Sequence, residues 1–410
     1  MTIDQWLSHV LKLQESGIKP GLERMNAYLD RYQGSPSCPV IAVGGTNGKG
    51  SCVEALVSIY SKAGFRVGSF ISPHLLKVNE RFRINTECVD DDLILEHFER
   101  INALGRDLGL SYFELLCVTA WQIFCEASLD VMIFEVGLGG RLDAVNALPL
   151  SHSIITSIDL DHQEYLGNDR DSIAIEKFGI LRENKAAVIA ETDLTDCMIK
   201  ALDQTGAMKY VINQSFKVVS NQKSHQYLGD TALSFTQCTI HPQVLGAVCK
   251  TLELTQSLLP VPNDLIQKTL CELQVPGRFE RVQGEPPMII DVAHNEAAIK
   301  NLLKQWPYPS SNTTMMVAFK KNKTIKEVLS NLNQYAQNII FVEMDDNAFV
   351  SKQVFIANLA SCVHYELISF DEVKERVWTM AQPTLVFGCF KLVGHVRSLF
   401  KERGHVIKCS

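Results

Sequence analysis

The chain has 410 residues, of which 46% are hydrophobic and 21% charged, and its formal net charge is −7. This length favours two or three domains over one, and the composition is that of a globular protein that can bury sizeable cores. Because Lys and Arg are spread along a mildly acidic chain, neither nucleic acid nor an anionic membrane is expected as a partner, and small molecules are the expected partners.

The N-terminus and the cysteines indicate the compartment. The chain begins Met-Thr-Ile-Asp-Gln-Trp, which lacks a cationic start followed by an apolar run, and no stretch approaches the roughly 18 apolar residues that a membrane helix needs. Its 12 cysteines are scattered without a Cys-x-x-Cys pair, a pattern more typical of reduced core thiols than of disulfides or metal ligands. We therefore expect a cytoplasmic protein.

The first half of the chain alternates apolar strands with helical segments. After amphipathic helical sequence, residues 39–43 form an apolar run that ends in glycines and predicts a buried strand. Helical spacing of apolar residues from Val53 to Tyr60 then predicts a helix that stops at Gly64. Further strands are predicted at 131–136, 153–158 and 186–190. This alternation predicts a doubly wound α/β domain with a mostly parallel sheet.

The pattern changes twice in the second half. Between residues 195 and 240 it weakens into short alternating pieces, which predict a small antiparallel patch before helical sequence at 244–254. After Pro276-Gly277 the rhythm of strand and helix restarts, with strands predicted at 288–292, 314–319, 339–343, 365–370 and 384–387. We place the domain boundary at this Pro-Gly pair. The predicted domains are an ATP-binding P-loop domain, 1–275, and a Rossmann-like α/β domain, 276–410.

A glycine-rich loop at residues 44–51 lies between a predicted strand and helix. In that context backbone N–H groups and a helix N-terminus bind phosphate oxygens. Lys49 would reach the β- and γ-phosphates, and Ser51 would lie near their magnesium ion. The spacing departs from the general Walker pattern, because Val43 occupies the first glycine position and Gly50 separates Lys49 from Ser51. The predicted nucleotide contacts are Gly45, Thr46, Asn47, Gly48, Lys49, Gly50 and Ser51. The alternative is a glycine turn without a ligand.

Two polar groups follow neighbouring predicted strands. Glu135 ends the strand 131–136, and His162 follows the strand 153–158 in the sequence Asp-Leu-Asp-His. Carboxyl ends of strands are where open α/β sheets place their sites, so these side chains should lie near one edge. A buried acid needs a cation, either a metal ion or, as the alternative, a salt bridge to Arg141. Lys177 lies in a predicted helical segment. Taken alone, it is interpreted as a surface residue whose ammonium group reaches water.

These motifs, taken together and in order, resemble the bacterial dihydrofolate synthase/folylpolyglutamate synthase family, a branch of the Mur-type ligases. The resemblance covers nearly the whole chain. The segments that carry it are 45–51, Ser72-Pro73-His74-Leu75, 135–143, 157–162, Glu176-Lys177, Pro276-Gly277-Arg278, 291–295 and Gly388-Cys389-Phe390.

The resemblance implies an ATP-dependent carbon–nitrogen ligase of folate biosynthesis. ATP would lie between the domains, held by the loop and by Gln243, Arg278 and Asp291. The resemblance also implies two Mg²⁺ ions, with Ser72, Glu135 and His162 as ligands and a carbamylated Lys177 helping to hold the second. The residues implied in catalysis are Lys49, Glu135, Asp143, His162 and Lys177. Those implied in substrate binding are Lys19, Pro20, Gly21, Ser72, His74, Ser111, Tyr112, Phe113, Glu114, Leu142, Asp143, Ala144 and His294.

The implied reaction also makes chemical sense. A carboxylate is a poor acyl donor, and transfer of the γ-phosphoryl group of ATP to it creates a good leaving group. The amine of L-glutamate then attacks the acyl phosphate, giving an amide, ADP and phosphate. With dihydropteroate the product is dihydrofolate, and with a folate it is a longer γ-glutamyl tail.

Some positions depart from the family pattern. Lys19 replaces an acid near the expected pterin pocket, Gln243 stands in a usual Asn-Ala-Ala segment near the adenine, and Cys389 replaces a common serine. The segment 318–323 is more basic than usual, and four lysines between 320 and 326 form either a glutamate contact or a solvated loop.

Three alternatives compete with a bifunctional ligase. The first is a folylpolyglutamate synthase that has lost the dihydropteroate reaction, and the second is a P-loop ATPase switch that makes no bond. A switch has no use for the second metal pocket that Glu135, His162 and Lys177 would form. The third is a cell-wall Mur ligase, but the residues ahead of Gly45 are too few for the uridine-nucleotide-binding domain of those enzymes. We expect a monomer, because no long apolar helix face is left over.

Overall fold

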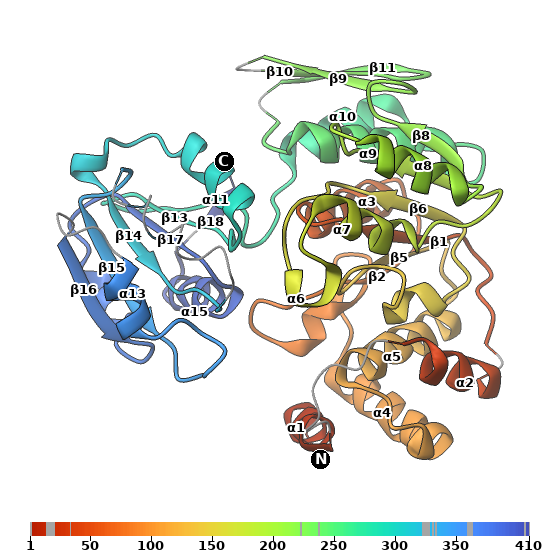
Figure 1. The fold of residues 1–410 in the computed structure, drawn as a ribbon, viewed down its shortest axis with the longest axis horizontal. Helices are drawn as coiled ribbons and strands as arrows, with labels where there is room; N and C mark the ends of the chain where they lie inside the picture. Colours follow the sequence, from red (N-terminus) through yellow and green to blue (C-terminus); the bar gives the residue numbers. More distant parts are fainter. Residues whose placement is uncertain are drawn as a thin grey trace. The chain divides into compact units, whose positions relative to one another are not determined.

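The chain forms two compact units, Met1–Leu273 and Gln274–Ser410 (Figure 1). The computed structural model describes residues 2–13, 21–32, 34–221, 224–236, 238–321, 329, 332, 334–358, 364–405 and 407–409. Among these residues, no helix combines the length and the apolar character that crossing a membrane requires.

The first unit is built on an eight-stranded sheet with the strand order β4-β3-β2-β5-β1-β6-β7-β8. The strands from β2 to β8 in this order are parallel, whereas β3 and β4 are added antiparallel at one edge. The bounds are β1 Val40–Gly44, β2 Val67–Phe70, β3 Phe82–Ile84, β4 Glu87–Cys88, β5 Val131–Glu135, β6 His152–Ile155, β7 Ala186–Ile189 and β8 Met208–Val211. The central strands are buried on both faces, which is why they read as continuous apolar runs.

Helices cover both faces of this sheet, each over its own apolar core (Figure 1). One face is covered by α3 Lys49–Lys62, α9 Pro242–Thr255 and α10 Asn263–Glu272. The other is covered by α1 Ile3–Leu13, α2 Glu23–Arg31, α4 Asp91–Gly105, α5 Tyr112–Glu126, α7 Arg170–Phe178 and α8 Asp196–Gln204. Short helical turns join these elements: η1 Val78–Arg81, η2 Arg106–Leu108, η3 Ala144–Ala147 and α6 Gln163–Leu166. The predicted doubly wound, mostly parallel domain is confirmed.

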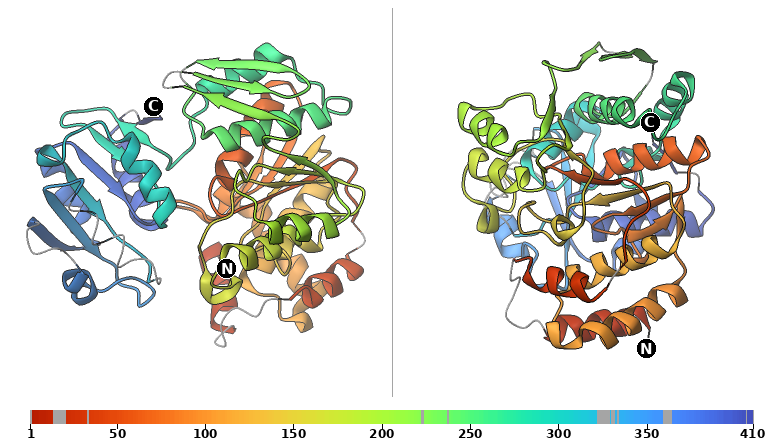
Figure 2. Two further views of the ribbon diagram at one scale, coloured as in Figure 1. Left: turned by 45° about the horizontal axis from the view of Figure 1, so that its top comes forward. Right: turned by 90° about the vertical axis from the view of Figure 1, so that its right-hand side faces the viewer.

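The predicted antiparallel patch is a three-stranded sheet, β11-β10-β9, over α9 and α10 (Figure 2). Its strands are β9 Lys217–Ser220, β10 Ser224–Leu228 and β11 Ala232–Thr236. Part of the prediction for 195–240 is wrong, because residues 210 and 211 belong to β8, which pairs parallel with β7 in the main sheet, and α8 precedes them. β8 is an edge strand with exposed residues, so it lacks the apolar run of its neighbours.

The second unit contains a seven-stranded sheet in the order β16-β15-β14-β17-β13-β12-β18. The strands are β12 Glu280–Val282, β13 Met288–Ile290, β14 Thr314–Val317, β15 Asn338–Glu343, β16 His364–Ser369, β17 Thr384–Phe387 and β18 Ile407–Cys409. The helical elements are α11 Glu296–Gln305, η4 Ser310–Asn312, α13 Lys352–Asn358, α14 Val373–Arg376, η5 Val377–Thr379 and α15 Phe390–Glu402. All five predicted strands are present and parallel. One edge is extended by β12, which pairs antiparallel with β13, and by β18, which pairs antiparallel with β12. The Rossmann-like prediction is thereby confirmed.

Candidate active site at the carboxyl edge of the eight-stranded sheet

The phosphate loop connects β1 to α3. It contains two glycines with positive φ, Gly45 at 143° and Gly48 at 86°. A Cβ atom on Gly45 would lie 2.0 Å from Thr156 Oγ1, and one on Gly48 would lie 2.7 Å from Val244 Cγ2. The loop therefore requires glycine for both its turn and its close packing. It delivers the chain directly into the N-terminus of a 14-residue helix, where backbone N–H groups attract anions.

Lys49 begins α3 and turns back over this loop. Its Nζ donates to the carbonyl oxygens of Gly45 at 3.0 Å and Thr46 at 3.2 Å. The ammonium group is thus held at the loop, where the sequence predicted it. Gly50 and Ser51 follow in the first turn of α3.

The loop is braced by the segment after β6. Thr46 N donates to Ser157 O at 2.7 Å, and Asn47 N donates to Ser157 Oγ at 3.0 Å. The carbonyl of Asn47 accepts from Thr156 Oγ1 at 2.7 Å. The backbone N–H of Asn47 is therefore engaged within the protein, and nucleotide binding by Asn47 stays a prediction.

Glu135 is a buried carboxylate beside this loop. It ends β5, which pairs with β1, and only 4% of its surface is exposed. Its Oε2 accepts from Ser72 N at 3.0 Å and lies 3.8 Å from where a Cβ atom on Gly50 would stand. The positive end of α3 therefore adjoins the carboxylate. The alternative salt bridge to Arg141 is wrong, because Arg141 pairs with Glu176 at 2.8 Å.

His162 follows β6, on the other side of β1 from β5. It has a left-handed backbone, with φ of 49°, and its side chain is 51% exposed. Asp161 Oδ1 accepts its N–H at 2.8 Å and lies 3.9 Å from its Nε2. The order β5-β1-β6 therefore sets Glu135, the phosphate loop and His162 at the ends of three adjacent parallel strands.

Lys177 is buried, with only 3% of its surface exposed, so the interpretation of a surface lysine is wrong. It lies on α7 against the glycine-rich loop after β5, where a Cβ atom on Gly140 would stand 2.9 Å from its Cα. Burial, reinforced by the positive charge of Lys49, lowers the pKa of Lys177 to about 7, although Asp161 and Asp143 act in the opposite direction. The amine is therefore easily uncharged.

Asp143 organises the same glycine-rich loop. Its carboxylate accepts three backbone N–H bonds, from Gly137 at 3.1 Å, Leu138 at 2.9 Å and Val145 at 3.0 Å. Burial nevertheless raises the pKa of Asp143 to about 6, against these bonds and the charge of Lys49. Leu142 and Ala144 flank it in the chain, and Ala144 is buried.

His74 belongs to a polar group that includes a residue missed in the sequence. Arg81 Nε donates to His74 Nδ1 at 2.9 Å, and the guanidinium lies 5.7 Å from the centre of the Tyr112 ring. Arg81 is buried, which is unusual for arginine. It follows Glu80 as the last residue of the helical turn η1, and nothing in that pattern marks it as buried.

Ser111 and Glu114 form the N-terminal cap of α5. Ser111 Oγ accepts from Glu114 N at 3.3 Å, and Glu114 Oε2 accepts from Ser111 N at 2.7 Å. Glu114 also pairs with Arg24 through two 2.9 Å bonds. The Phe113 ring fills the space where a Cβ atom on Gly137 would stand, 2.5 Å from its Cζ. These contacts are within the protein, and substrate binding by the segment stays a prediction.

The remaining predicted substrate residues near the N-terminus are described in part. Gly21 is described, with φ of 157°, whereas Lys19 and Pro20 lie outside the described residues. The basic segment after β14 is likewise only partly described: Lys320 and Lys321 are exposed, and residues 322–328 lie outside the described part.

Gln243 lies in the first turn of α9, in the first unit. Its Nε2 donates to Thr192 Oγ1 at 3.4 Å, and the next residue, Val244, is the one that packs against Gly48. Gln243 is therefore near the phosphate loop in space, although almost 200 residues separate them.

The predicted residues of the second unit lie near the carboxyl ends of β13 and β17. Asp291 is buried and accepts from Phe279 N at 2.8 Å and Ala293 N at 2.7 Å, and burial raises its pKa. His294 Nδ1 lies 2.9 Å from Val292 O. The Arg278 guanidinium lies 5.7 Å from the Phe390 ring centre. At the start of α15, Cys389 Sγ accepts from Leu392 N at 3.4 Å, so the thiol caps the helix.

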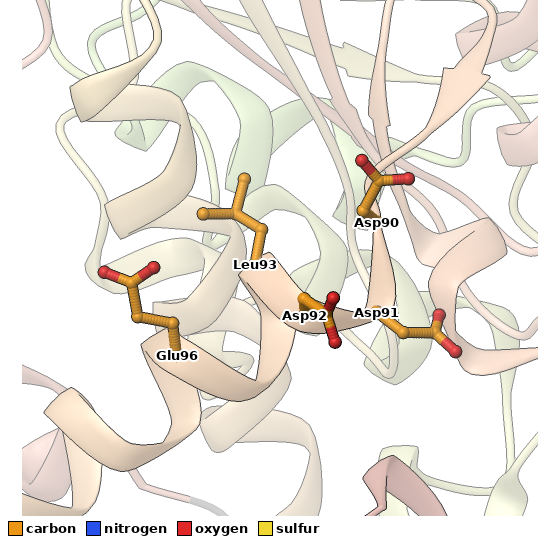
Figure 3. Close-up of a pocket in the computed structure, with 5 residues that line it drawn as sticks. All are labelled: Asp90, Asp91, Asp92, Leu93 and Glu96. Atoms are coloured by element: carbon orange, nitrogen blue, oxygen red, sulfur yellow. The ribbon is translucent and has the colours of Figure 1, made fainter.

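A hollow of about 440 Å³ lies elsewhere in the first unit, at the start of α4. Four carboxylates, from Asp90, Asp91, Asp92 and Glu96, line it with Leu93 (Figure 3). This lining repels phosphate and carboxylate groups, so the hollow is no candidate for a nucleotide site.

Comparisons with known proteins agree with this geometry. No family model matches the chain. It is 31% identical over 411 residues to the dihydrofolate synthase/folylpolyglutamate synthase of Escherichia coli (strain K12), covering 97% of this chain and 95% of that protein. It is 29% identical over 428 residues to the protein of the same name from Bacillus subtilis (strain 168), covering 97% and 98%.

Solved structures show the same likeness. E. coli FolC in complex with DHPP and ADP superimposes with a TM-score of 0.91 at 28% identity, covering 98% of this chain and 99% of that one. A bifunctional folylpolyglutamate synthase/dihydrofolate synthase with Mn, AMPPNP and L-glutamate bound gives a TM-score of 0.88 at 30% identity, covering 98% of each chain. The likeness thus extends over both units.

Proposed function

Because the chain belongs to the bacterial dihydrofolate synthase/folylpolyglutamate synthase family, we propose that it works by the chemistry the phosphate loop and the buried Glu135 support. It is an ATP-dependent ligase that joins L-glutamate to dihydropteroate, forming dihydrofolate, and to folates, extending their γ-glutamyl tails. The observation that carries the mechanism is the buried Glu135 carboxylate at the N-terminus of α3, next to Gly50, which follows Lys49 of the phosphate loop.

The residues present fit a divalent cation carried by ATP. Magnesium is usually held by one or two carboxylates together with phosphates and water. In the described part of the chain no three His, Cys, Asp or Glu side chains gather as a ready-made metal site. Ser72, Glu135 and His162 are the proposed ligands. The bound ion would neutralise charge on the phosphates as the γ-phosphoryl group is transferred.

Lys177 is the proposed carbamate. Formation of a carbamate joins an uncharged amine to carbon dioxide and releases one proton. The pKa of Lys177, lowered to about 7 by burial, makes the uncharged amine accessible at neutral pH. The product would be an anion and would support binding of a second Mg²⁺ ion. Asp161 and Asp143, whose negative charges act on the Lys177 amine, would favour a cation bound near the carbamate.

Lys49 and the α3 N-terminus would stabilise the phosphates during transfer. Lys49 Nζ would exchange the carbonyl oxygens of Gly45 and Thr46 for phosphate oxygens, which are stronger acceptors because they are charged. The acceptor carboxylate then takes the γ-phosphoryl group, and ADP leaves. The glutamate amine attacks the acyl carbon, loses a proton, and expels phosphate.

The folate-side residues remain proposals. The buried Arg81 contacts the half-buried His74 and Tyr112 next to the Ser72 segment, which supports a substrate pocket there. Asp143 supports it indirectly by holding residues 137 and 138. Of the predicted nucleotide contacts, Gln243 is supported by its neighbour's packing on Gly48. Roles for Arg278, Asp291 and His294 rest on the family resemblance.

Acceptor-dependent ADP release tests the function. Purified protein with MgATP and L-glutamate should release ADP when dihydropteroate or tetrahydrofolate is added. With each acceptor, the amount of amide product should equal the amount of ADP released. Turnover with tetrahydrofolate alone would favour a folylpolyglutamate synthase only. ADP release at the same rate without an acceptor would contradict ligation and favour an ATPase switch.

A further inference from the structure

The segment 157–162, here called the metal loop, carries the proposed ligand His162 but belongs to no strand or helix. Backbone N–H and C=O groups in such a segment need partners from elsewhere, especially where they are buried. The backbone N–H and C=O groups of Ile158 and Asp159 are unusual, because each of them forms a hydrogen bond with a side chain.

Arg170 and Glu191 take both backbone groups of Ile158. Glu191 Oε2 accepts from Ile158 N at 2.6 Å, and Arg170 Nε donates to Ile158 O at 3.0 Å. Glu191 follows β7, the strand next to β6, and Arg170 begins α7. The two side chains therefore approach the metal loop from two different elements.

Arg170 and Glu191 are themselves fixed. Glu191 is buried, and its Oε1 accepts from Asp193 N at 2.9 Å and lies 3.4 Å from an Arg170 nitrogen. Arg170 also donates to Asp193 Oδ2 at 2.6 Å and Asp193 O at 2.9 Å. A buried carboxylate that is both paired and hydrogen-bonded is held in one position.

Thr46 holds the next residue from the side of the phosphate loop. Its Oγ1 accepts from Asp159 N at 3.0 Å and donates to Asp159 O at 3.1 Å. The four backbone groups of Ile158 and Asp159 are thus held by three side chains. Only two residues, Leu160 and Asp161, then separate this held pair from the proposed ligand His162.

We propose that Arg170 and Glu191 are positioning residues that, together with Thr46, set the location of His162 and so the affinity for the divalent cation. This inference rests on the proposed function, because it assumes that His162 binds the ion. Arg170 and Glu191 act through the backbone of the metal loop, so they are not catalytic residues. Residues that orient metal ligands typically change metal affinity by about 10-fold to 100-fold when they are replaced.

The first variants are Glu191→Gln and Arg170→Lys. In the wild type, each oxygen of the Glu191 carboxylate accepts a hydrogen bond from a backbone N–H group. In Glu191→Gln an NH₂ group replaces one oxygen, so it must face one of those donors. In Arg170→Lys, the charge stays, but one ammonium group cannot reproduce the spread of the guanidinium over Ile158 and Asp193. We expect the Mn²⁺ dissociation constant, titrated with a non-hydrolysable ATP analogue, to rise about 10-fold in each.

The matched control is Arg100→Lys, because Arg100 makes a comparable two-bond pair with Glu126, at 3.0 Å and 2.6 Å, between α4 and α5. Its Mn²⁺ affinity should equal that of the wild type.

Amide hydrogen exchange of the segment 157–163 gives a readout that does not depend on ligase activity. Exchange should be faster in Glu191→Gln and Arg170→Lys than in the wild type, and unchanged in Arg100→Lys. Unchanged Mn²⁺ affinity in both variants, with or without a lower melting temperature, would overturn the proposal. If the wild type bound Mn²⁺ and nucleotide but formed no amide, the proposed function would fail. The Mn²⁺ affinities of the variants would still test this inference.

Discussion

Lys177 is a lysine whose charge state depends on burial. Because burial lowers its pKa from the usual 10.5 to about 7, the uncharged fraction rises as pH rises through neutrality. Carbamylation should therefore increase between about pH 6 and pH 8, and activity should fall when carbon dioxide is removed. Magnetic resonance of protein equilibrated with isotopically labelled bicarbonate checks this directly.

The control for that measurement is Lys177→Met, which keeps much of the buried volume and has no amine. It should give no carbamate signal and little ligase activity. An equal signal in the variant, or a wild-type signal that does not change with pH, would contradict carbamylation at Lys177.

Glu135 permits a conservative test of metal binding. Glu135→Gln keeps an oxygen that can accept the Ser72 N–H bond, but it removes the charge. We expect ADP formation to fall about 100-fold or more, as for other groups that stabilise transition-state charge, with Mn²⁺ binding weakened and the melting temperature preserved. Near-native turnover at low Mg²⁺ would show that Glu135 is not a ligand.

At the scale of an element, the phosphate loop depends on the space at Gly48. Gly48→Ala adds a Cβ atom that would lie 2.7 Å from Val244, in a left-handed residue. Gly64→Ala is a matched control, because Gly64 has a similar φ of 92° and nothing within 4 Å of the added atom. Both should lose about 1 kcal/mol of stability through the backbone. Only Gly48→Ala should also weaken ATP binding, as measured by calorimetry.

The cap of α5 gives Ser111 a structural role beside the substrate contact that the family resemblance implies. Ser111→Ala removes the side chain that accepts the Glu114 N–H bond and should lower the free energy of unfolding by about 1 kcal/mol in urea. If Ser111 only caps the helix, the KM for the pterin substrate stays unchanged. A raised KM with unchanged stability would instead support the predicted substrate contact.

At the scale of the whole molecule, the predictions that the structure confirms are those that depend on local sequence patterns. Buried parallel strands such as β1 and β5 have continuous apolar runs, so they were found, and the strand order could then gather Glu135, Lys49 and His162 at one edge. β8 was misassigned because an edge strand with exposed residues lacks that run. The shielding of Lys177 and Arg81 was missed because burial of a charged residue depends on elements distant in the sequence.

Some whole-molecule predictions remain. The domain bounds 1–275 and 276–410, the monomeric state, the cytoplasmic location and nucleotide binding by residues of both domains stay predictions. Sedimentation equilibrium tests the monomer, which should give the mass of one chain at all concentrations. A mass that rises with concentration would contradict it.

The strand order of the first unit has a consequence for how the protein is made. β1 is complete once residue 44 leaves the ribosome, but its two neighbours are β5 and β6, which begin at Val131 and His152. Contacts between such distant segments are slow to form, because the entropy of closing the intervening chain is lost first. The apolar β1 must therefore wait, unpaired, through the synthesis of almost a hundred residues, which makes this strand the point where a nascent chain most needs protection from aggregation.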